Sequence, residues 1–128
     1  MIVLLDTCTF LWIVEGSREL SAPATEIIRN RANRLFLSAV SAWEISLKHS
    51  IGNLPMPEPP EKFVPHQRSR HGIEPLPLLE DDTFRLHRLP KHHRDPFDRL
   101  LVCQALARQM PILTPDPLIR RYPATTIW

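Results

Sequence analysis

Short apolar runs separated by helix-forming stretches constrain the fold of this 128-residue chain more than any other feature. Such runs are typical of strands that are buried on both faces of a parallel sheet. Between them, apolar residues recur with the spacing of helices that pack one face against a sheet. We therefore predict a three-layer α/β/α fold with a mostly parallel central sheet and helices on both faces. The predicted strands are Ile2–Leu5, Leu35–Leu37, Ile112–Leu113 and Thr125–Trp128.

Several predicted helices begin at residues that cap helices. Serine and aspartate accept hydrogen bonds from the first free backbone N–H groups, and proline is tolerated in the first turn. Ser21 followed by Pro23, and Asp95 followed by Pro96, have this pattern. The expected helices are residues 7–14, a segment that follows Ser21, and residues 38–49, 80–89 and 96–109, with weaker helical character over 61–71 and a helical turn at 117–121.

The helix that follows the second strand is expected to bury one apolar face. Val40, Trp43 and Leu47 recur there at helical spacing. Glu44 is adjacent to Trp43, so we expect its carboxylate to lie close to that buried face. As an alternative, Glu44 pairs with Lys48 one turn later on a solvated surface.

Proline is unusually frequent, with 14 prolines against 3 glycines. The cluster at 55–65 predicts a rigid connection between helices. Pro75 and Pro77 limit the extended segment 73–79 to an edge strand, because proline cannot donate to a sheet ladder. No change in composition marks a boundary, so we expect a single domain over residues 1–128.

Composition and charge exclude several classes of protein. No apolar run reaches the ~18 residues that span a bilayer, and the N-terminal residues do not resemble a signal peptide. Cys8 and Cys103 form no CxxC pattern, which favours reduced thiols in a cytoplasmic protein over a disulfide framework or a zinc ribbon. The net charge of +2 is too close to neutral to indicate a nucleic-acid partner by itself.

Four acidic residues are predicted to converge at one edge of the sheet: Asp6, Glu44, Asp98 and Asp116. Asp6 and Asp116 follow strands, Glu44 lies in the second turn of a predicted helix, and Asp98 lies in the first turn of the long helix. In a wound α/β fold, the carboxyl ends of strands and the amino ends of the following helices share an edge. Each acid also has a structural interpretation, as a helix cap or an ion-pair partner.

Crowded carboxylates repel one another unless a cation neutralises them, so at least one should have a raised pKa in the metal-free protein. Oxygen ligands with few histidines favour a hard ion, Mg²⁺ or Mn²⁺. Such an ion can activate water and brace a phosphodiester oxygen. The pattern therefore predicts a divalent-metal site at this edge.

Four motifs that contain these acids resemble the acidic motifs of PIN-domain ribonucleases, with the closest match to VapC-like toxins of bacterial toxin–antitoxin pairs. They are Asp6-Thr7-Cys8-Thr9, Ser38–Ile45 with its Trp-Glu-Ile, His93–Leu101 with its Arg-Asp-Pro-Phe-Asp-Arg-Leu, and Leu113-Thr114-Pro115-Asp116. Their order and spacing agree over essentially the whole chain. The prolines on both sides of Asp116 depart from the family pattern.

The resemblance implies a Mg²⁺-dependent endoribonuclease, with Mn²⁺ as a substitute, that is held inactive by a bound antitoxin. Asp6, Glu44, Asp98 and Asp116 would form the catalytic, metal-binding quartet. Thr7 and Thr114 would support it, and Asp95 would cap a helix and not act as a fifth ligand. The implied partners are RNA, a second copy of the chain and an antitoxin that inserts a basic residue into the acidic site.

Other residues admit more than one interpretation. Arg94 and Arg99 belong to a basic run before and within the long helix, which either binds RNA phosphates or forms a solvated face. Arg99 is alternatively an ion-pair partner of Asp98. We interpret His92 and His93 as a polar loop, because adjacent histidines have poor geometry for a shared metal site.

Two other function classes compete with the nuclease. A haloacid-dehalogenase-like phosphatase also has an acid after its first strand, but it needs a second Asp where this chain has Cys8. Cys8 itself lacks a partner base and is a poor candidate nucleophile. The other alternative is a non-catalytic PIN-like partner-binding module, which the four intact acids disfavour.

Overall fold

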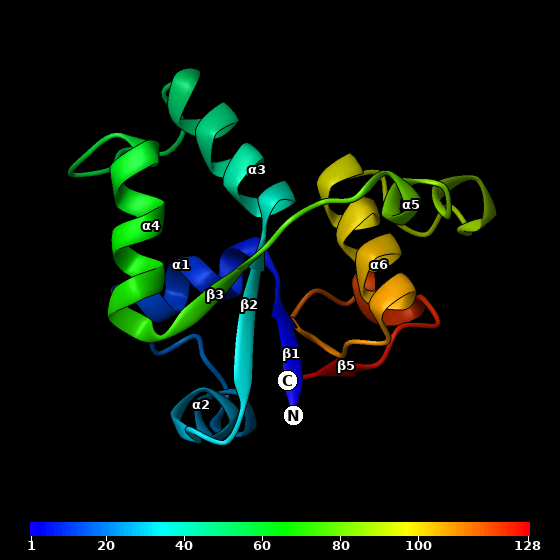
Figure 1. Ribbon diagram of the computed structural model, residues 1–128, viewed down its shortest axis with the longest axis horizontal. Coiled ribbons are helices and arrows are strands. Elements are labelled where there is room, and N and C mark those ends of the chain that lie inside the picture. Colours follow the sequence, from blue (N-terminus) through cyan, green and yellow to red (C-terminus); the bar gives the residue numbers. More distant parts are fainter.

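The computed structural model describes residues 1–128. Its centre is a five-stranded sheet in the order β3-β2-β1-β4-β5, with all neighbouring strands parallel. Helices cover both faces, because parallel neighbours are joined by crossover connections (Figure 1). The predicted α/β/α arrangement is confirmed. The elements are β1 (Ile2–Leu5), α1 (Thr7–Glu15), α2 (Ala22–Arg29), β2 (Arg34–Ser38), α3 (Ala39–Ser50), α4 (Pro60–His71), β3 (Ile73–Leu76), α5 (Glu80–Thr83), η1 (Leu86–Arg88), α6 (Pro96–Arg108), β4 (Ile112–Leu113), η2 (Ile119–Arg121) and β5 (Thr126–Ile127).

The core consists of two apolar clusters, one on each face of the sheet. Successive residues of β1 alternate between them, because side chains of a strand point to opposite faces. Val3 and Leu5 join Phe10 of α1 and Phe63 of α4 in one cluster, and Leu4 joins the other cluster, which α6 covers. Both faces of β1 are therefore buried, as its uninterrupted apolar sequence predicts.

Helix α3 is formed as predicted, but the face it buries is different. Trp43 is 65% exposed and Leu47 is 39% exposed, so the prediction that they belong to the core is wrong. The buried face instead carries Val40, Glu44 and Ile45. Val40 packs in one core cluster and Ile45 in the other, and this double anchorage fixes the rotation of the helix.

The segment expected to form one helix over residues 80–89 is divided into α5 and η1. Of residues 84–89, only Leu89 is buried. A longer helix here would have no apolar face to bury, and helices of this length depend on such packing. The longest helix, α6, has 13 residues, and no helix combines the length and apolar character needed to cross a bilayer.

The proline-rich segments behave as their chemistry predicts except at Pro65, which was expected in the rigid connection and lies inside α4 (Pro60–His71). The strand that contains Pro75 lies at the edge of the sheet and pairs only with β2. The cluster at 55–60 forms the irregular connection between α3 and α4. Helix α4 then ends at Gly72, whose φ of 66° lies in the left-handed region that glycine adopts without strain.

Candidate active site

The four predicted acids line one cavity of about 200 Å³ at the carboxyl edge of the sheet. Asp6 follows β1 and Asp116 follows β4, which pairs with β1. Glu44 projects from the second turn of α3, and Asp98 from the first turn of α6. The predicted convergence of residues far apart in the sequence is therefore correct.

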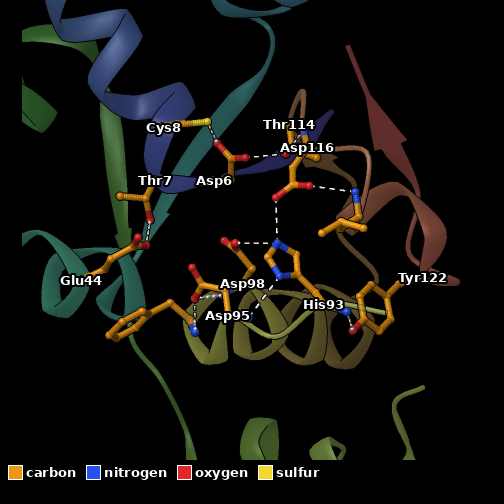
Figure 2. Close-up of polar contacts among 12 residues, drawn as sticks. Asp6, Thr7, Cys8, Glu44, His93, Asp95, Asp98, Thr114, Asp116 and Tyr122 are labelled. Carbon is orange, nitrogen blue, oxygen red and sulfur yellow. Dashed lines mark hydrogen bonds and ion pairs between the residues drawn. The ribbon is translucent and has the colours of Figure 1, made fainter. Parts of the chain in front are cut away.

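Asp6 is a buried helix cap whose side chain also faces the cavity. Its Oδ1 accepts hydrogen bonds from the Thr9 backbone N–H at 2.8 Å and from the Cys8 thiol at 3.2 Å. Its Oδ2 accepts a short hydrogen bond from the Thr114 hydroxyl. The two interpretations of Asp6, as a helix cap and as a member of the acidic site, are therefore both correct, because the same carboxylate caps α1 and lines the cavity. These contacts hold the carboxylate in a single orientation (Figure 2).

Glu44 is 4% exposed although it is charged. The Thr7 hydroxyl donates to its Oε1 at 2.7 Å and lies 2.9 Å from the hydroxyl oxygen of Ser41. Lys48 donates to its Oε2 at 2.6 Å. The predicted pairing of Glu44 with Lys48 exists, but the carboxylate is buried and not on a solvated surface. The hydrogen bond to Glu44 raises the pKa of Lys48.

Asp98 and Asp116 are held together by a histidine that the sequence did not single out for this role. Nε2 of His93 lies 3.0 Å from Oδ2 of Asp98 and 2.9 Å from Oδ2 of Asp116 (Figure 2). The backbone N–H of Asp95 donates to the other ring nitrogen, Nδ1, at 3.1 Å. The interpretation of the histidine pair as a plain polar loop is thus wrong for His93 and holds for His92, which packs edge-on against Tyr122.

The remaining contacts of this region are hydrogen bonds that involve backbone N–H groups. Asp95 accepts hydrogen bonds from the N–H groups of Phe97 and Asp98, so it is the predicted N-cap of α6. Oδ1 of Asp116 accepts from the N–H of Leu118 at 2.8 Å, and its own N–H donates to Thr114. The prolines on either side of Asp116 therefore leave its side chain directed at the cluster.

Burial and crowding alter the protonation of Asp98. Burial raises the pKa of Asp98 from 3.8 to about 7, and the nearby charges of Asp95 and Glu44 add to the effect while His93 opposes it. This confirms the expectation of at least one raised carboxyl pKa. Burial, with the adjacent Asp6 carboxylate, also raises the pKa of the Cys8 thiol, so this cysteine is not a thiolate nucleophile.

The chain was compared with models of known protein families. A family model described as PIN domain matches residues 3–124. The chain belongs to the PIN-domain family. The sequence motifs that resemble this family include each of the acids that line the cavity.

Relatives of this PIN domain include a curated protein and solved structures. Ribonuclease VapC16 of Mycobacterium tuberculosis is 40% identical over 62 residues, which are 48% of this chain and 43% of that protein. The match thus spans less than half of that relative. The crystal structure of VapBC2 from Rickettsia felis bound to a promoter DNA fragment has a TM-score of 0.71 at 16% identity, covering 99% of this chain and 98% of that chain. The structure of VapBC-1 from nontypeable Haemophilus influenzae has a TM-score of 0.63 at 17% identity and covers 99% of this chain and 97% of that chain. At such identities the likeness establishes the fold.

The cavity of the PIN domain fits a hard divalent cation. The charged groups that could coordinate an ion there are carboxylates, whose oxygens Mg²⁺ and Mn²⁺ prefer as ligands. A carboxylate oxygen has two lone pairs, so the hydrogen bond that orients Oδ2 of Asp6 leaves a further lone pair for an ion. Five carboxylates, those of the four predicted acids and of Asp95, line the cavity beside a single lysine, Lys48, and leave an excess of negative charge that a cation would offset.

Arg94 and Arg99, the two candidate RNA-binding residues, lie outside the acidic cavity. Arg99 forms no ion pair with Asp98, although the two are adjacent on α6, and its Nε is buried without a hydrogen-bond partner. It lines a second cavity of about 580 Å³ together with Lys91, His87 and Phe84, and this cavity contains no acid. Arg94 is exposed to solvent.

Proposed function

We propose that this PIN domain is a metal-dependent endoribonuclease that acts in the cytoplasm as the toxin of a toxin–antitoxin pair. The observation that carries the proposal is the meeting of four carboxylates from four chain segments in one cavity. The name of its relative, a ribonuclease, and the toxin–antitoxin complexes among its structural neighbours support it.

Asp6, Glu44, Asp98 and Asp116 would hold Mg²⁺, or Mn²⁺ in its place. When bound, the ion supplies a Lewis acid that lowers the pKa of water and stabilises charge on a phosphodiester oxygen. The chain's own contribution is to fix the carboxylates before the ion arrives. Thr114 orients Asp6 and Thr7 orients Glu44, so the ligands need little rearrangement.

Substrate binding is assigned to the basic side of α6. Lys91 and Arg99 line a cavity free of acids, and an ammonium and a guanidinium are both groups that pair with phosphate oxygens. The exposed side chain of Phe84 in the same cavity offers a face for a base of single-stranded RNA. Arg94 would contribute long-range attraction to the same strand.

The acidic cavity also suggests how a partner protein would inhibit the enzyme. A guanidinium inserted by an antitoxin would pair bidentately with the carboxylates and take the place of the cation. Replacing the inserted Arg of the antitoxin by Ala should restore ribonuclease activity to the complex.

We further propose that the toxin is a homodimer.

The decisive experiment is RNA cleavage by purified protein with EDTA, Mg²⁺ or Mn²⁺. Wild type should cleave only with metal and leave 5′-phosphate and 3′-hydroxyl ends. Asp6→Asn should be inactive with an unchanged circular dichroism spectrum, whereas Asp81→Asn, which alters an exposed acid of α5, should be active. Undiminished cleavage by Asp6→Asn, or by wild type in EDTA, would overturn the proposal.

A further inference from the structure

His93 forms a compact triad with two acids of the site. Its Nε2 and one carboxylate oxygen from each of Asp98 and Asp116 lie within 4.8 Å of one another. By distance alone, these three atoms could be the ligands of a metal ion. The direction of the hydrogen bonds around the ring decides between a ligand and a different role.

The backbone N–H of Asp95 determines where the imidazole carries its proton. This N–H donates to Nδ1 of His93, which must therefore offer a lone pair and not a proton. A ring with an unprotonated Nδ1 carries its proton on Nε2. Nε2 then donates its hydrogen bond to Oδ2 of Asp116, lies 3.0 Å from Oδ2 of Asp98, and has no lone pair for a cation. Histidine ligands have the opposite arrangement, because their second nitrogen usually donates to an acceptor.

The surrounding backbone keeps the ring in this orientation. Asp95 is the N-cap of α6, so its N–H is tied to the start of that helix. The backbone N–H of His93 donates to the hydroxyl of Tyr122 at 3.0 Å, which anchors the loop from the other side. A rotation of the ring that exposed a lone pair to the cavity would leave the Asp95 N–H without its acceptor.

The Nε2–H group thus lies between carboxylates that belong to different segments, α6 and the loop after β4. It donates to Oδ2 of Asp116 and lies 3.0 Å from Oδ2 of Asp98, and Oδ1 of Asp116 is held separately by the Leu118 N–H. Oδ1 of Asp98 is left without a protein partner. The N–H group placed between the two carboxylates reduces their repulsion, and its contact with Oδ2 leaves the other oxygen of Asp98 free.

We infer that His93 is a positioning residue that clamps Asp98 to Asp116 through Nε2–H and is not itself a metal ligand. The inference rests on the proposed function only in assuming that these acids receive a divalent cation. Removal of such an outer partner typically weakens metal affinity or activity by roughly 10–100-fold.

Nuclear magnetic resonance of protein with ¹⁵N-labelled histidine tests the tautomer directly. The ¹⁵N shifts distinguish a protonated from an unprotonated ring nitrogen, and the spectrum of His93→Gln identifies which of the 6 histidines is His93. We expect a protonated Nε2 and an unprotonated Nδ1 both without metal and with saturating Mg²⁺. An unprotonated Nε2 in the presence of Mg²⁺ would identify a ligand and overturn the inference.

Calorimetry with Mg²⁺ and three variants tests the clamp. His93→Ala should weaken Mg²⁺ binding roughly 10–100-fold and lower kcat while the KM for RNA changes little. His93→Gln, whose amide can donate to both acids, should recover most of the affinity. His92→Ala should bind Mg²⁺ like wild type, because His92 contacts Tyr122 and not the acids.

These measurements separate the clamp from the nuclease proposal. If wild type cleaves RNA and His93→Ala does so equally well with unchanged Mg²⁺ affinity, the clamp is refuted while the function stands. If wild type binds Mg²⁺ and His93→Ala loses that affinity, but no RNA is cleaved, the clamp stands and the nuclease proposal fails.

Discussion

Replacing Asp98 by asparagine should stabilise the metal-free protein at neutral pH. Burial and neighbouring acids raise the pKa of Asp98 from 3.8 to about 7, so ionising this group costs free energy in the folded state. Below about pH 4 the carboxyl is protonated in both the folded and the unfolded chain, and no penalty exists. As the pH rises toward 7, only the unfolded chain releases the proton readily, and the free energy of unfolding falls. The loss is complete above about pH 7.

The size of this penalty follows from the shift in pKa. About three units at ~1.4 kcal/mol each give an upper limit of roughly 4 kcal/mol. The Asp98 side chain is 16% exposed and faces an open cavity, so solvent screening reduces the cost, and we expect about 2 kcal/mol. For a domain of this length, Tm shifts by roughly 4 °C for each kcal/mol of stability, a value between those of smaller and larger domains. Asp98→Asn should therefore raise Tm by about 8 °C.

The assay is thermal denaturation in EDTA across the range from about pH 4 to pH 8. The Tm difference between Asp98→Asn and wild type should be near zero at the acidic end and grow to a plateau above neutrality. Asp81→Asn, an exposed acid of α5, should follow wild type throughout. If the plots of Tm against pH for Asp98→Asn and wild type are parallel, the reasoning is refuted. Mg²⁺ at a hundred times its Kd should raise the free energy of unfolding of wild type by about 2.7 kcal/mol, and that of the variant by less.

Three further substitutions test other parts of the structure. Thr114→Val removes the hydroxyl that donates to Asp6 and should lower the free energy of unfolding in urea by about 1–3 kcal/mol; a change within error would mean that this hydrogen bond adds nothing to stability. Trp43→Ser should change stability by less than about 0.5 kcal/mol, because Trp43 is exposed, whereas a core tryptophan would cost several times more. Arg99→Gln should raise the KM for RNA and reduce the slope of log affinity against log salt by about 0.7. Arg18→Gln, which changes an exposed arginine of the α1–α2 connection, is its control, and equal slopes for the two variants would exclude Arg99 as a phosphate contact.

The sequence by itself determined the architecture and the location of the site. Short apolar runs predicted buried parallel strands, and Ser21 and Asp95 marked the starts of α2 and α6. Because the carboxyl ends of parallel strands share one edge, acids such as Asp6 and Asp116 could be brought together before any coordinate was known. These features depend on local backbone chemistry and on a general rule of topology, so a single sequence suffices.

Tertiary structure alone decided which face of α3 is buried. Val40 belongs to two overlapping apolar faces of the helix, one with Trp43 and Leu47, as predicted, and a second with Ile45, and local periodicity cannot rank the two. Packing against clusters on both sides of the sheet selected the second face and buried Glu44 with it. The choice depends on the summed burial of distant segments, which no local window contains.

The role of His93 was likewise decided by contacts between segments far apart in the chain. Its backbone is fixed by the hydroxyl of Tyr122, 29 residues later, and its ring by the N–H of Asp95 and the carboxylate of Asp116. A loop histidine has no periodicity to reveal its direction, and its neighbour His92 has the same local chemistry. Only the folded chain supplies the donor at Nδ1 and the two carboxylates beside Nε2, and the hydrogen bonds with Asp95 and Asp116 set the proton and the orientation of the ring.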